Sequence, residues 1–479
     1  MKKNKSFDLP VKKNDIIELE ISGMTNEGNG VGRYENVAVF VPFTAIGDKI
    51  KCRIVKLEKT FCYGIIESFM NESDDRIASD CEVYSKCGGC AFRHITYESE
   101  SKIKETFVKD AFSRIGKIDF EFDAILNAEN TCFYRNKCQY PVCDENGVAI
   151  AGFYSKRSHR VVPYIDCKLQ PEIFRSIVKD IIDYQNKNNI KAYNELDNSG
   201  LLRHIFIRKG YYTNEIMVGL VVTKNCHLEY KPLSDELMSK YSEIKSVMLN
   251  INSENTNVIL GKKTLLLAGR EYIEDIMCEK RIKLSLQSFY QVNTHQAEKL
   301  YSIAAEYAQL SGNETLIDLY CGAGTIGLSM SDKVKKLIGV EVVPQAVDNA
   351  KENAKLNNVS NAEFICADAG QAALMLENNN TKPDVVILDP PRKGCDLQTI
   401  ESVCAMNPDR IVMISCNPAT AARDAKIFAE KGYNIKKGRA VDLFPRTTHV
   451  ESVVCLSREK ADDYVRISVQ TKDLKTKAN

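Results

Sequence analysis

The stretch DLYCGAGTIG, residues 318–327, follows a short run of strand-forming residues and precedes a segment that favours a helix. Its glycines have the spacing GxGxxG. Glycines in such a turn let the backbone bend tightly and approach a ligand, while an acidic residue at the end of the second strand binds ribose hydroxyls. Glu341 ends the next predicted strand and fits that role. The stretch therefore predicts a nucleotide-like cofactor at the carboxyl edge of a parallel sheet.

Apolar runs and helix-forming segments alternate through the C-terminal part of the chain, from residue 314 onward. The runs are residues 316–319, 336–340, 362–365, 385–388 and 411–414. This alternation predicts a doubly wound, Rossmann-like α/β domain. NAD-dependent oxidoreductases and S-adenosylmethionine-dependent methyltransferases both use such a domain, so the glycine turn alone leaves both classes open.

The composition indicates a multidomain globular protein. A chain of 479 residues exceeds the roughly 250–300 that one core can hold, so we expect two or three domains. With 44% hydrophobic and 27% charged residues, a wholly disordered chain is excluded. The N-terminus has lysines but no apolar segment typical of a signal peptide, which predicts a cytoplasmic protein with no membrane partner. The net charge of +1 gives no global argument for nucleic-acid binding.

Short strands separated by turn residues fill the first 70 residues. Residues 16–21, 37–41 and 51–57 are rich in β-forming residues, and glycine turns at 26–30 and 47–48 separate them. Several strands in so short a segment predict a small OB-like barrel. The glycines at 28, 30 and 32, followed by residues 37–42, resemble the TRAM domain, an RNA-binding barrel found in RNA-modifying enzymes.

The remaining boundaries follow from changes in pattern. Residues 71–285 mix a helical segment at 173–184 with strands at 201–207 and 216–223. We therefore expect an α+β domain between the barrel and the C-terminal domain. The predicted order is a barrel at 1–70, a middle RNA-binding domain at 71–285, a cofactor-binding domain at 286–460 and a polar tail at 461–479.

The segment Asp389-Pro390-Pro391-Arg392 stands at the end of the fourth predicted strand. Ligands bind at the carboxyl ends of such strands. An acid followed by two prolines there is typical of methyltransferases that act on nucleobases or similar planar groups. The alternative is a rigid strand-to-helix turn without a chemical role. The segment favours a methyltransferase over an NAD-dependent oxidoreductase.

A cysteine and a glutamate lie near the ends of the two last predicted strands. Ser415-Cys416-Asn417-Pro418 follows one strand, and His449-Val450-Glu451 leads into the other. A thiolate that adds to carbon 6 of a pyrimidine creates an enolate, which makes carbon 5 nucleophilic enough to accept a methyl group. A base then removes the carbon-5 proton and the thiolate leaves. A free cysteine has a pKa of ~8.5, so such a site must favour the thiolate.

Three of the seventeen cysteines form a compact pattern, Cys81-x5-Cys87-Gly88-Gly89-Cys90. Thiolates in such an arrangement hold structural zinc or an iron–sulfur cluster. Zinc more often uses two Cys-x2-Cys pairs, which this pattern lacks. A fourth ligand is needed, and by proximity alone Cys132, Cys138 and Cys143 are all candidates.

Taken together, these motifs resemble the RNA uracil-C5 methyltransferase family, and within it the TRAM-bearing, iron–sulfur 23S ribosomal RNA enzymes. The resemblance covers about residues 14–456. It implies that Cys416 is the nucleophile and Glu451 the proton acceptor. It also implies that Cys167 is the fourth ligand, with Cys81, Cys87 and Cys90, of a 4Fe–4S cluster. Because methylation of carbon 5 needs no electron transfer, we expect this cluster to have a structural role.

The resemblance also implies where S-adenosylmethionine binds. The expected contacts are with Gln291, Tyr320, Gly322, Gly324, Glu341, Asp368 and Asp389. The expected partner is a ribosomal RNA, with no obligate protein partner evident. Interleaved basic and aromatic residues at 133–137 and 202–205 are candidates for RNA contact, since such side chains can grip phosphates and stack on bases.

Three alternatives remain. A tRNA uracil-C5 methyltransferase shares the catalytic motifs but typically lacks both the TRAM segment and the cysteine pattern. A non-catalytic RNA-binding iron–sulfur protein would not need Cys416 and Glu451. An NAD-dependent oxidoreductase would leave Ser-Cys-Asn-Pro unexplained.

Overall fold

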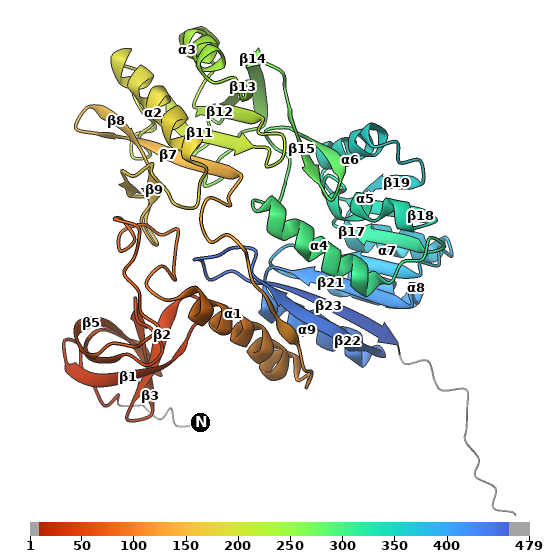
Figure 1. Ribbon diagram of the computed structural model, residues 1–479, viewed down its shortest axis with the longest axis horizontal. Helices are drawn as coiled ribbons and strands as arrows, with labels where there is room; N and C mark the ends of the chain where they lie inside the picture. The colour runs from red at the N-terminus through yellow and green to blue at the C-terminus, as the bar shows by residue number, and fades with distance from the viewer. Residues whose placement is uncertain (1–8, 459–479) are drawn as a thin grey trace, which may run out of the picture.

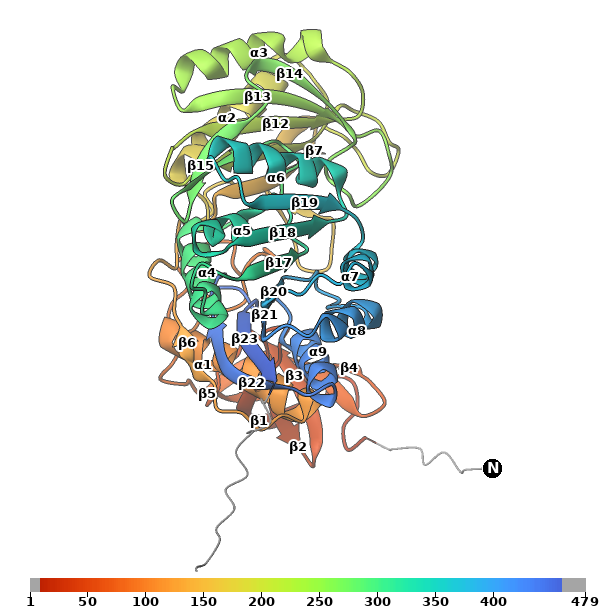
Figure 2. The ribbon, with the colours of Figure 1, turned by 90° about the vertical axis from the view of Figure 1, so that its right-hand side faces the viewer.

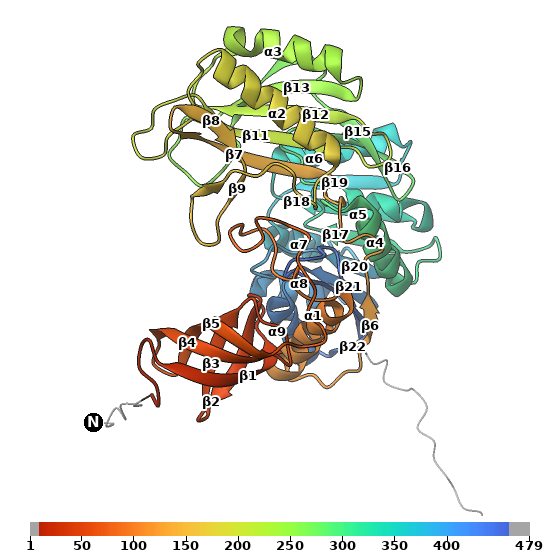
Figure 3. The same ribbon diagram turned by 60° about the vertical axis from the view of Figure 1, so that its left-hand side comes forward.

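The computed structural model describes residues 9–458; the predicted polar tail at 461–479 lies outside these residues. Three large sheets organise the chain: a closed barrel, a six-stranded sheet and an eight-stranded sheet. The barrel and the six-stranded sheet lie at opposite ends of the molecule (Figure 1 and Figure 3). The eight-stranded sheet occupies the part of the molecule between these two ends. Within the described range, no helix combines the length and apolar character needed to span a bilayer.

The N-terminal barrel has the strand order β1-β2-β3-β5-β4. Its strands are β1 (Ile16–Met24), β2 (Asn29–Tyr34), β3 (Val37–Pro42), β4 (Lys49–Leu57) and β5 (Phe61–Asn71). In β1, exposed and buried residues alternate, as expected when one face of a strand lines a core. Gly64 in β5 leaves room for the Cys52 thiol, because a Cβ at this position would lie 2.2 Å from that sulfur. The predicted barrel is confirmed.

The six-stranded sheet forms the far end of the molecule and has the order β14-β13-β12-β11-β7-β8. Its strands are β7 (Lys137–Glu145), β8 (Val148–Ala151), β11 (Leu202–Lys209), β12 (Ile216–Val222), β13 (Ile244–Ile251) and β14 (Lys263–Gly269). Helices α2 (Glu172–Lys187) and α3 (His227–Lys240) pack on one face and share its apolar core. The short hairpin of β9 (Phe153–Tyr154) and β10 (Val161–Val162) lies beside it.

The eight-stranded sheet has the order β19-β18-β17-β20-β21-β23-β22-β6. Its strands are β6 (Asp123–Leu126), β17 (Thr315–Leu319), β18 (Lys336–Glu341), β19 (Ala362–Cys366), β20 (Val385–Leu388), β21 (Arg410–Ser415), β22 (Tyr433–Val441) and β23 (Glu451–Arg458). Strands β17 to β21 are parallel, and β23 is antiparallel to its neighbours. The order reverses between β17 and β20, which is where open α/β sheets bind their ligands.

Helices cover both faces of this sheet. One core is shared with α4 (Thr294–Ala308), α5 (Thr325–Ser329) and α6 (Pro344–Leu356). The other is shared with α1 (Tyr97–Ala111), α7 (Ala369–Asn378), α8 (Leu397–Met406) and α9 (Pro418–Glu430). Figure 2 shows the sheet from its edge, with α4 and α7 to α9 on opposite sides. The hairpin of β15 (Ile273–Met277) and β16 (Lys280–Leu284) leads from the six-stranded sheet to α4.

One segment departs from the predicted order of domains. Residues 97–126, expected in the middle domain at 71–285, build on the eight-stranded sheet instead. Strand β6 pairs in parallel with β22, and the short π-helical turn η1 (Phe112–Gly116) after α1 packs against α9. Phe112 and Phe122 are buried in the same core as α9. Most apolar side chains of this segment are covered by the C-terminal sheet and its helices, which explains the departure, while Ile103 packs towards the barrel with Ala45 and Phe92.

Candidate active site

The glycine turn between β17 and α5 has an unusual backbone. Tyr320, Gly322 and Gly324 have φ values of 68°, 56° and 81°. A Cβ at Gly322 would meet nothing within 4 Å, so its surroundings leave space for a ligand. Glu341 at the end of β18 accepts hydrogen bonds from the backbone N–H of Gly322 at 3.1 Å and of Val343 at 2.9 Å. The Glu341 carboxylate therefore holds the glycine turn in place, next to the site where we expect the cofactor ribose.

Two further carboxyl groups are buried at the same edge. Asp318 in β17 accepts a hydrogen bond from Gly327 N at 2.9 Å, while its other oxygen has no partner. Burial raises the pKa of Asp318 to about 7, helped by the negative charges of Asp389 and Glu341. Burial also raises the pKa of Asp389 to about 7. Asp318 was part of the quoted motif, yet no residue pattern indicated that its carboxyl group is buried beneath the turn.

The other two predicted cofactor contacts are in different surroundings. Asp368 is the N-cap of α7, and its side chain accepts hydrogen bonds from Gly370 N at 3.0 Å and Gln371 N at 3.4 Å. One of its oxygens is thereby used for capping. Gln291 precedes α4, and its carbonyl oxygen accepts a hydrogen bond from the Asn136 side chain at 2.8 Å. Gln291 thus lies where the six-stranded sheet meets the domain of the eight-stranded sheet, which we call the catalytic sheet below.

Cys416 occupies the connection between β21 and α9. Asn417 caps α9 by accepting a hydrogen bond from Ala419 N, and its amide donates to the Arg392 carbonyl at 3.0 Å. This second bond ties the Cys416 connection to the Asp-Pro-Pro-Arg turn after β20. Cys416, half-buried, lines a cavity of about 460 Å³. The thiol therefore lies at the sheet edge that carries the predicted cofactor turn.

Glu451 is the first residue of β23 and is only 4% exposed. Burial raises its pKa to about 8; the negative charge of Asp389 adds to the rise and Arg392 opposes it. The pKa of Cys416 is raised by burial and then by Glu451 and Asp389, while Arg392 again opposes the rise. Ser415 pairs with Ser452 across β21 and β23, so Cys416 and Glu451, one residue beyond this pair at the same end of the two antiparallel strands, lie side by side. The Asn417–Arg392 bond ties this pair to the turn that begins at Asp389.

Arg392 and His449 are functional candidates that the sequence reasoning did not single out. The Arg392 guanidinium lies 2.8 Å from His449 Nδ1. Burial and nearby cations, Arg392 first among them, lower the pKa of His449 to about 4, so its ring is neutral near pH 7. Arg392 is the cation that acts on both Cys416 and Glu451. The sequence could have indicated Arg392 as a site residue, because it directly follows Asp389-Pro390-Pro391 at the strand end where ligands bind.

The walls of the Cys416 cavity come from three parts of the chain. Met24 and Asn26 contribute from the barrel, and Asp110 and Arg114 from α1 and the turn that follows it. The catalytic sheet contributes the Cys416 connection and the loop before β23; those lining residues are Arg392, Cys416, Asn417, Pro418, Ala419, Thr448, His449 and Val450. The barrel is thus part of the cavity that contains the nucleophile.

The four predicted cluster ligands line a second cavity of about 120 Å³, namely Cys81, Cys87, Cys90 and Cys167. Arg93 donates a hydrogen bond to the Cys90 sulfur at 3.4 Å, and Gly89 N donates to the Cys87 sulfur at 3.3 Å. Between residues 9 and 458, no group of three or more histidine, cysteine or acidic side chains is close enough to hold a single metal ion. The four thiols therefore share the lining of one cavity.

The alternative fourth ligands do not line this cavity. Cys138 is buried in the apolar core of the six-stranded sheet. Cys132 and Cys143 are half-buried elsewhere, and Cys143 lines a different pocket beside Tyr154. Of the four candidates, only Cys167 joins the other three cysteines around the cavity.

The predicted RNA contacts at 133–137 and 202–205 are mostly buried. Arg203 is 5% exposed and donates to the carbonyl oxygens of Asn252 and Glu254 at 2.7 Å each. His204 is also buried, and the Tyr134 hydroxyl donates to the Pro445 carbonyl at 2.9 Å. Phe133, 45% exposed, is the aromatic residue of the two segments that faces solvent. The prediction is therefore wrong for Arg203, His204 and Tyr134, whose polar groups brace the protein itself.

Comparison with known proteins agrees with this geometry. Residues 188–459 match the family described as tRNA (Uracil-5-)-methyltransferase, and residues 10–66 match the TRAM domain. Two similar proteins are described as uncharacterized RNA methyltransferases. One, from Bacillus cereus, is 40% identical over 94% of this chain and 98% of its own. The other, from Clostridium tetani, is also 40% identical, with the same shares covered.

Among solved structures, the fold resembles that of a Pyrococcus abyssi tRNA (uracil-54, C5)-methyltransferase, determined in complex with S-adenosyl-L-homocysteine. The TM-score is 0.74 at 24% identity, over 92% of this chain and 100% of that one. A family match over more than half of the chain and relatives that cover nearly all of it agree with the fold and with the site. The chain therefore belongs to the RNA (uracil-5-)-methyltransferase family of S-adenosylmethionine-dependent enzymes.

Proposed function

We propose that this enzyme methylates carbon 5 of a uridine in 23S ribosomal RNA through a covalent bond between Cys416 and the uracil. The observation that carries the proposal is the shared site of Cys416, Glu451 and Asp389: the Ser415–Ser452 pairing sets Cys416 beside Glu451, and Asn417 bonds to the turn that follows Asp389. The target base must leave its stack to reach a cavity of this kind.

Each side chain has a task in the reaction. The Cys416 sulfur adds to carbon 6 of the uracil, and Arg392 favours the thiolate and balances the negative charge that develops on the ring. S-adenosylmethionine supplies the methyl group that the enolate attacks. The ionised form of Glu451, held out of water, then accepts the proton from carbon 5, and the thiolate leaves as the double bond re-forms.

The S-adenosylmethionine site is assigned to the glycine turn and the strand ends around it. Glu341 would bind the ribose hydroxyls; the support is its hydrogen bond to the turn at Gly322, where the backbone is open to a ligand. Tyr320, Gly324, Asp389 and Gln291 complete the proposed contacts. For Asp368, the oxygen not used in capping α7 remains for the adenine.

The cysteine cavity fits a thiolate-held 4Fe–4S cluster. Burial raises the pKa of Cys87 and Cys90, and raises that of Cys167 to about 12. Buried thiols become thiolates when bound metal supplies positive charge, and loading then releases protons. A cavity of about 120 Å³ suits a group larger than one ion. Hydrogen bonds to sulfur, such as those from Arg93 and Gly89, are the kind that tune bound clusters.

Ribosomal RNA is proposed as substrate from the resemblance to the TRAM-bearing 23S ribosomal RNA enzymes; the barrel and middle domain alone do not decide it, because the Pyrococcus tRNA enzyme shares the fold over 92% of this chain. Met24 and Asn26 of the barrel line the cavity of the nucleophile, so an RNA strand that reaches Cys416 passes the barrel. Methylation of uracil itself requires neither the barrel nor the four cysteines of the second cavity. The second candidate is a tRNA, because the matching family and the Pyrococcus neighbour are both named for tRNA.

The test offers the purified enzyme unmodified 23S ribosomal RNA and unmodified tRNA in parallel, with S-adenosylmethionine at one salt concentration. We expect 5-methyluridine in the ribosomal RNA. Strong methylation of tRNA with none of 23S RNA would replace the first candidate by the second.

A further inference from the structure

The loop between β22 and β23, residues 442–450, carries His449 and leads directly into Glu451. Helix α1, whose C-terminal end lines the Cys416 cavity, anchors this loop through its N-terminal half. Lys104 of α1 is fully buried and donates to Asp442 Oδ1 at 2.8 Å and to the Phe444 carbonyl at 3.1 Å. The start of the loop is therefore fixed by a buried cation.

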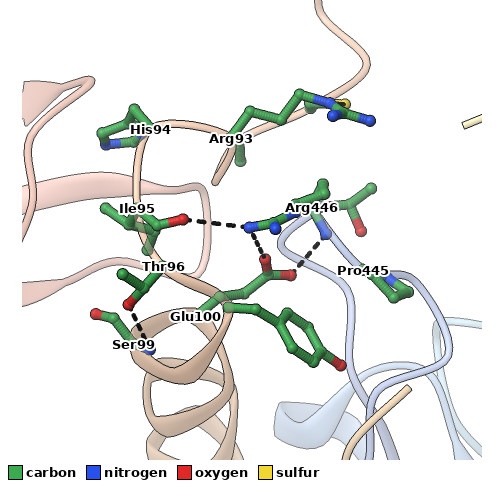
Figure 4. A network of polar contacts seen from close by, with 12 residues as sticks. Arg93, His94, Ile95, Thr96, Ser99, Glu100, Pro445 and Arg446 are labelled. Carbon is green, nitrogen blue, oxygen red and sulfur yellow. Dashed lines mark hydrogen bonds and ion pairs between the residues drawn. The ribbon is translucent and has the colours of Figure 1, made fainter. Parts of the chain in front are cut away.

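The middle of the loop is held by one carboxylate of α1. Glu100 Oε1 accepts a hydrogen bond from Arg446 N at 2.6 Å, and its Oε2 lies 3.5 Å from the Arg446 guanidinium. The same guanidinium donates to the Ile95 carbonyl at 3.2 Å, as Figure 4 shows. Glu100 thus binds both the backbone and the side chain of a single loop residue.

The segment that bears the cysteines grips the same residue. Ala91 N and Phe92 N donate to the Arg446 carbonyl at 2.8 Å and 3.2 Å. Ala91 is the residue directly after Cys90. Arg446 is therefore held by its N–H, its carbonyl and its side chain, and each contact comes from residues 91–100.

The charges in this contact balance. Glu100 and Asp442 face Lys104 and Arg446, and Lys104 also donates to Glu100 Oε1 at 2.7 Å. All but Arg446, which is nearly buried, are completely shielded from solvent. Moving the loop would leave a buried charge without its partner, which is strongly unfavourable. The network therefore holds the loop in one position.

We propose that Glu100 and Arg446 are positioning residues for the proton-removal step, because they fix the loop that carries His449 and delivers Glu451. The proposal rests on the proposed role of Glu451 as the base. Cys416 lies on a separate connection between β21 and α9, which α1 does not hold by this network. Loosening the loop should then slow release of the methylated RNA more than it slows attack by the thiol.

The experiment compares Glu100→Gln with wild type in two assays on the full-length protein. In the first, RNA carrying 5-fluorouridine traps the covalent complex, and its rate of formation reports attack by Cys416. In the second, ordinary RNA is used, and the decay of the methylated covalent complex on a denaturing gel reports proton removal. The matched control is Glu98→Gln, which breaks the exposed Glu98–Lys102 pair on the same helix.

We expect Glu100→Gln to trap 5-fluorouridine RNA at close to the wild-type rate. Its release step should slow by roughly 10–100-fold, the size of effect that a small misplacement of a catalytic group produces. Glu98→Gln should match wild type in both assays. Equal slowing of both steps by Glu100→Gln, or no slowing of either, would overturn the proposal.

Two further variants make each outcome decisive. If Glu100→Gln does not fold, Arg446→Lys replaces it, since it keeps the charge but cannot reach Glu100 and Ile95 together. Glu451→Gln is assayed in parallel. If it fails to accumulate the methylated complex, the assignment of the base is wrong; if it accumulates the complex while the loop variants do not, only the positioning role is wrong.

Discussion

A base with the pKa of Glu451 should make release of methylated RNA depend on pH in a range where an ordinary carboxylate shows no change. The pKa of about 8 leaves the carboxyl group mostly protonated at pH 7. The ionised form is therefore a minority at pH 7 and the majority at pH 9, and only the ionised form can accept the carbon-5 proton. The elimination step should therefore accelerate about tenfold between these pH values. A glutamate of ordinary pKa, near 4.5, is already ionised throughout this range.

The assay isolates this step from attack by Cys416, whose thiol also ionises as pH rises. The covalent complex is formed at pH 7 in a single turnover, the pH is raised rapidly, and the decay of the complex is followed on denaturing gels. Glu451→Gln serves as the control, with residual decay that should not change with pH. A wild-type decay rate that is equal at pH 7 and pH 9 would refute the reasoning, as would the same slope in both proteins.

Lys104→Met should destabilise the protein by about 3–5 kcal/mol, because it leaves the buried carboxylates of Glu100 and Asp442 without their shared cation. Thermal unfolding checks this, and an unchanged melting temperature would contradict it. Anaerobically purified protein should be brown and contain about four irons per chain. Serine at Cys167 should lower both signals, whereas Cys132→Ser, away from the cavity, should not. Arg114 is an exposed cation that lines the Cys416 cavity, so we expect it to contact an RNA phosphate. Arg114→Ala should then weaken RNA binding and lower the slope of log K against log salt by about one. The control Lys179→Ala breaks a comparable exposed pair on α2 and should leave the slope unchanged; equal slopes in all three proteins would count against the contact.

The sequence predicted the fold wherever local pattern determines it. Partly alternating apolar residues correctly predicted the barrel strands. Apolar runs between helix-forming segments correctly predicted the parallel strands from β17 to β21. Residues 97–126 were misplaced, because β6 finds its partner in β22, more than 300 residues along the chain. The pairing of such distant segments depends on which apolar surface is left uncovered in the folded protein, and periodicity within the segment does not encode it.

The site residues that stand at strand ends could be predicted from the sequence, and the contacts between distant segments could not. Cys416, Glu341 and Asp389 follow strands, and the ends of parallel strands meet at one edge of a sheet. Residue type and position in the sequence were therefore enough. The Arg392–His449 contact and the binding of Arg446 by Glu100 join segments whose proximity appears only after folding. Arg203 shows the converse case, since its charge suggested RNA while its guanidinium binds carbonyl oxygens inside the protein.

The covalent bond between Cys416 and RNA is the central claim, and it can be measured directly. Wild-type enzyme is incubated with S-adenosylmethionine and substrate RNA that contains 5-fluorouridine at the target position. Fluorine at carbon 5 cannot be removed as a proton, so the adduct should persist as a slowly migrating band on a denaturing gel. Cys416→Ala should give no such band, and a variant that still traps the RNA would contradict the account.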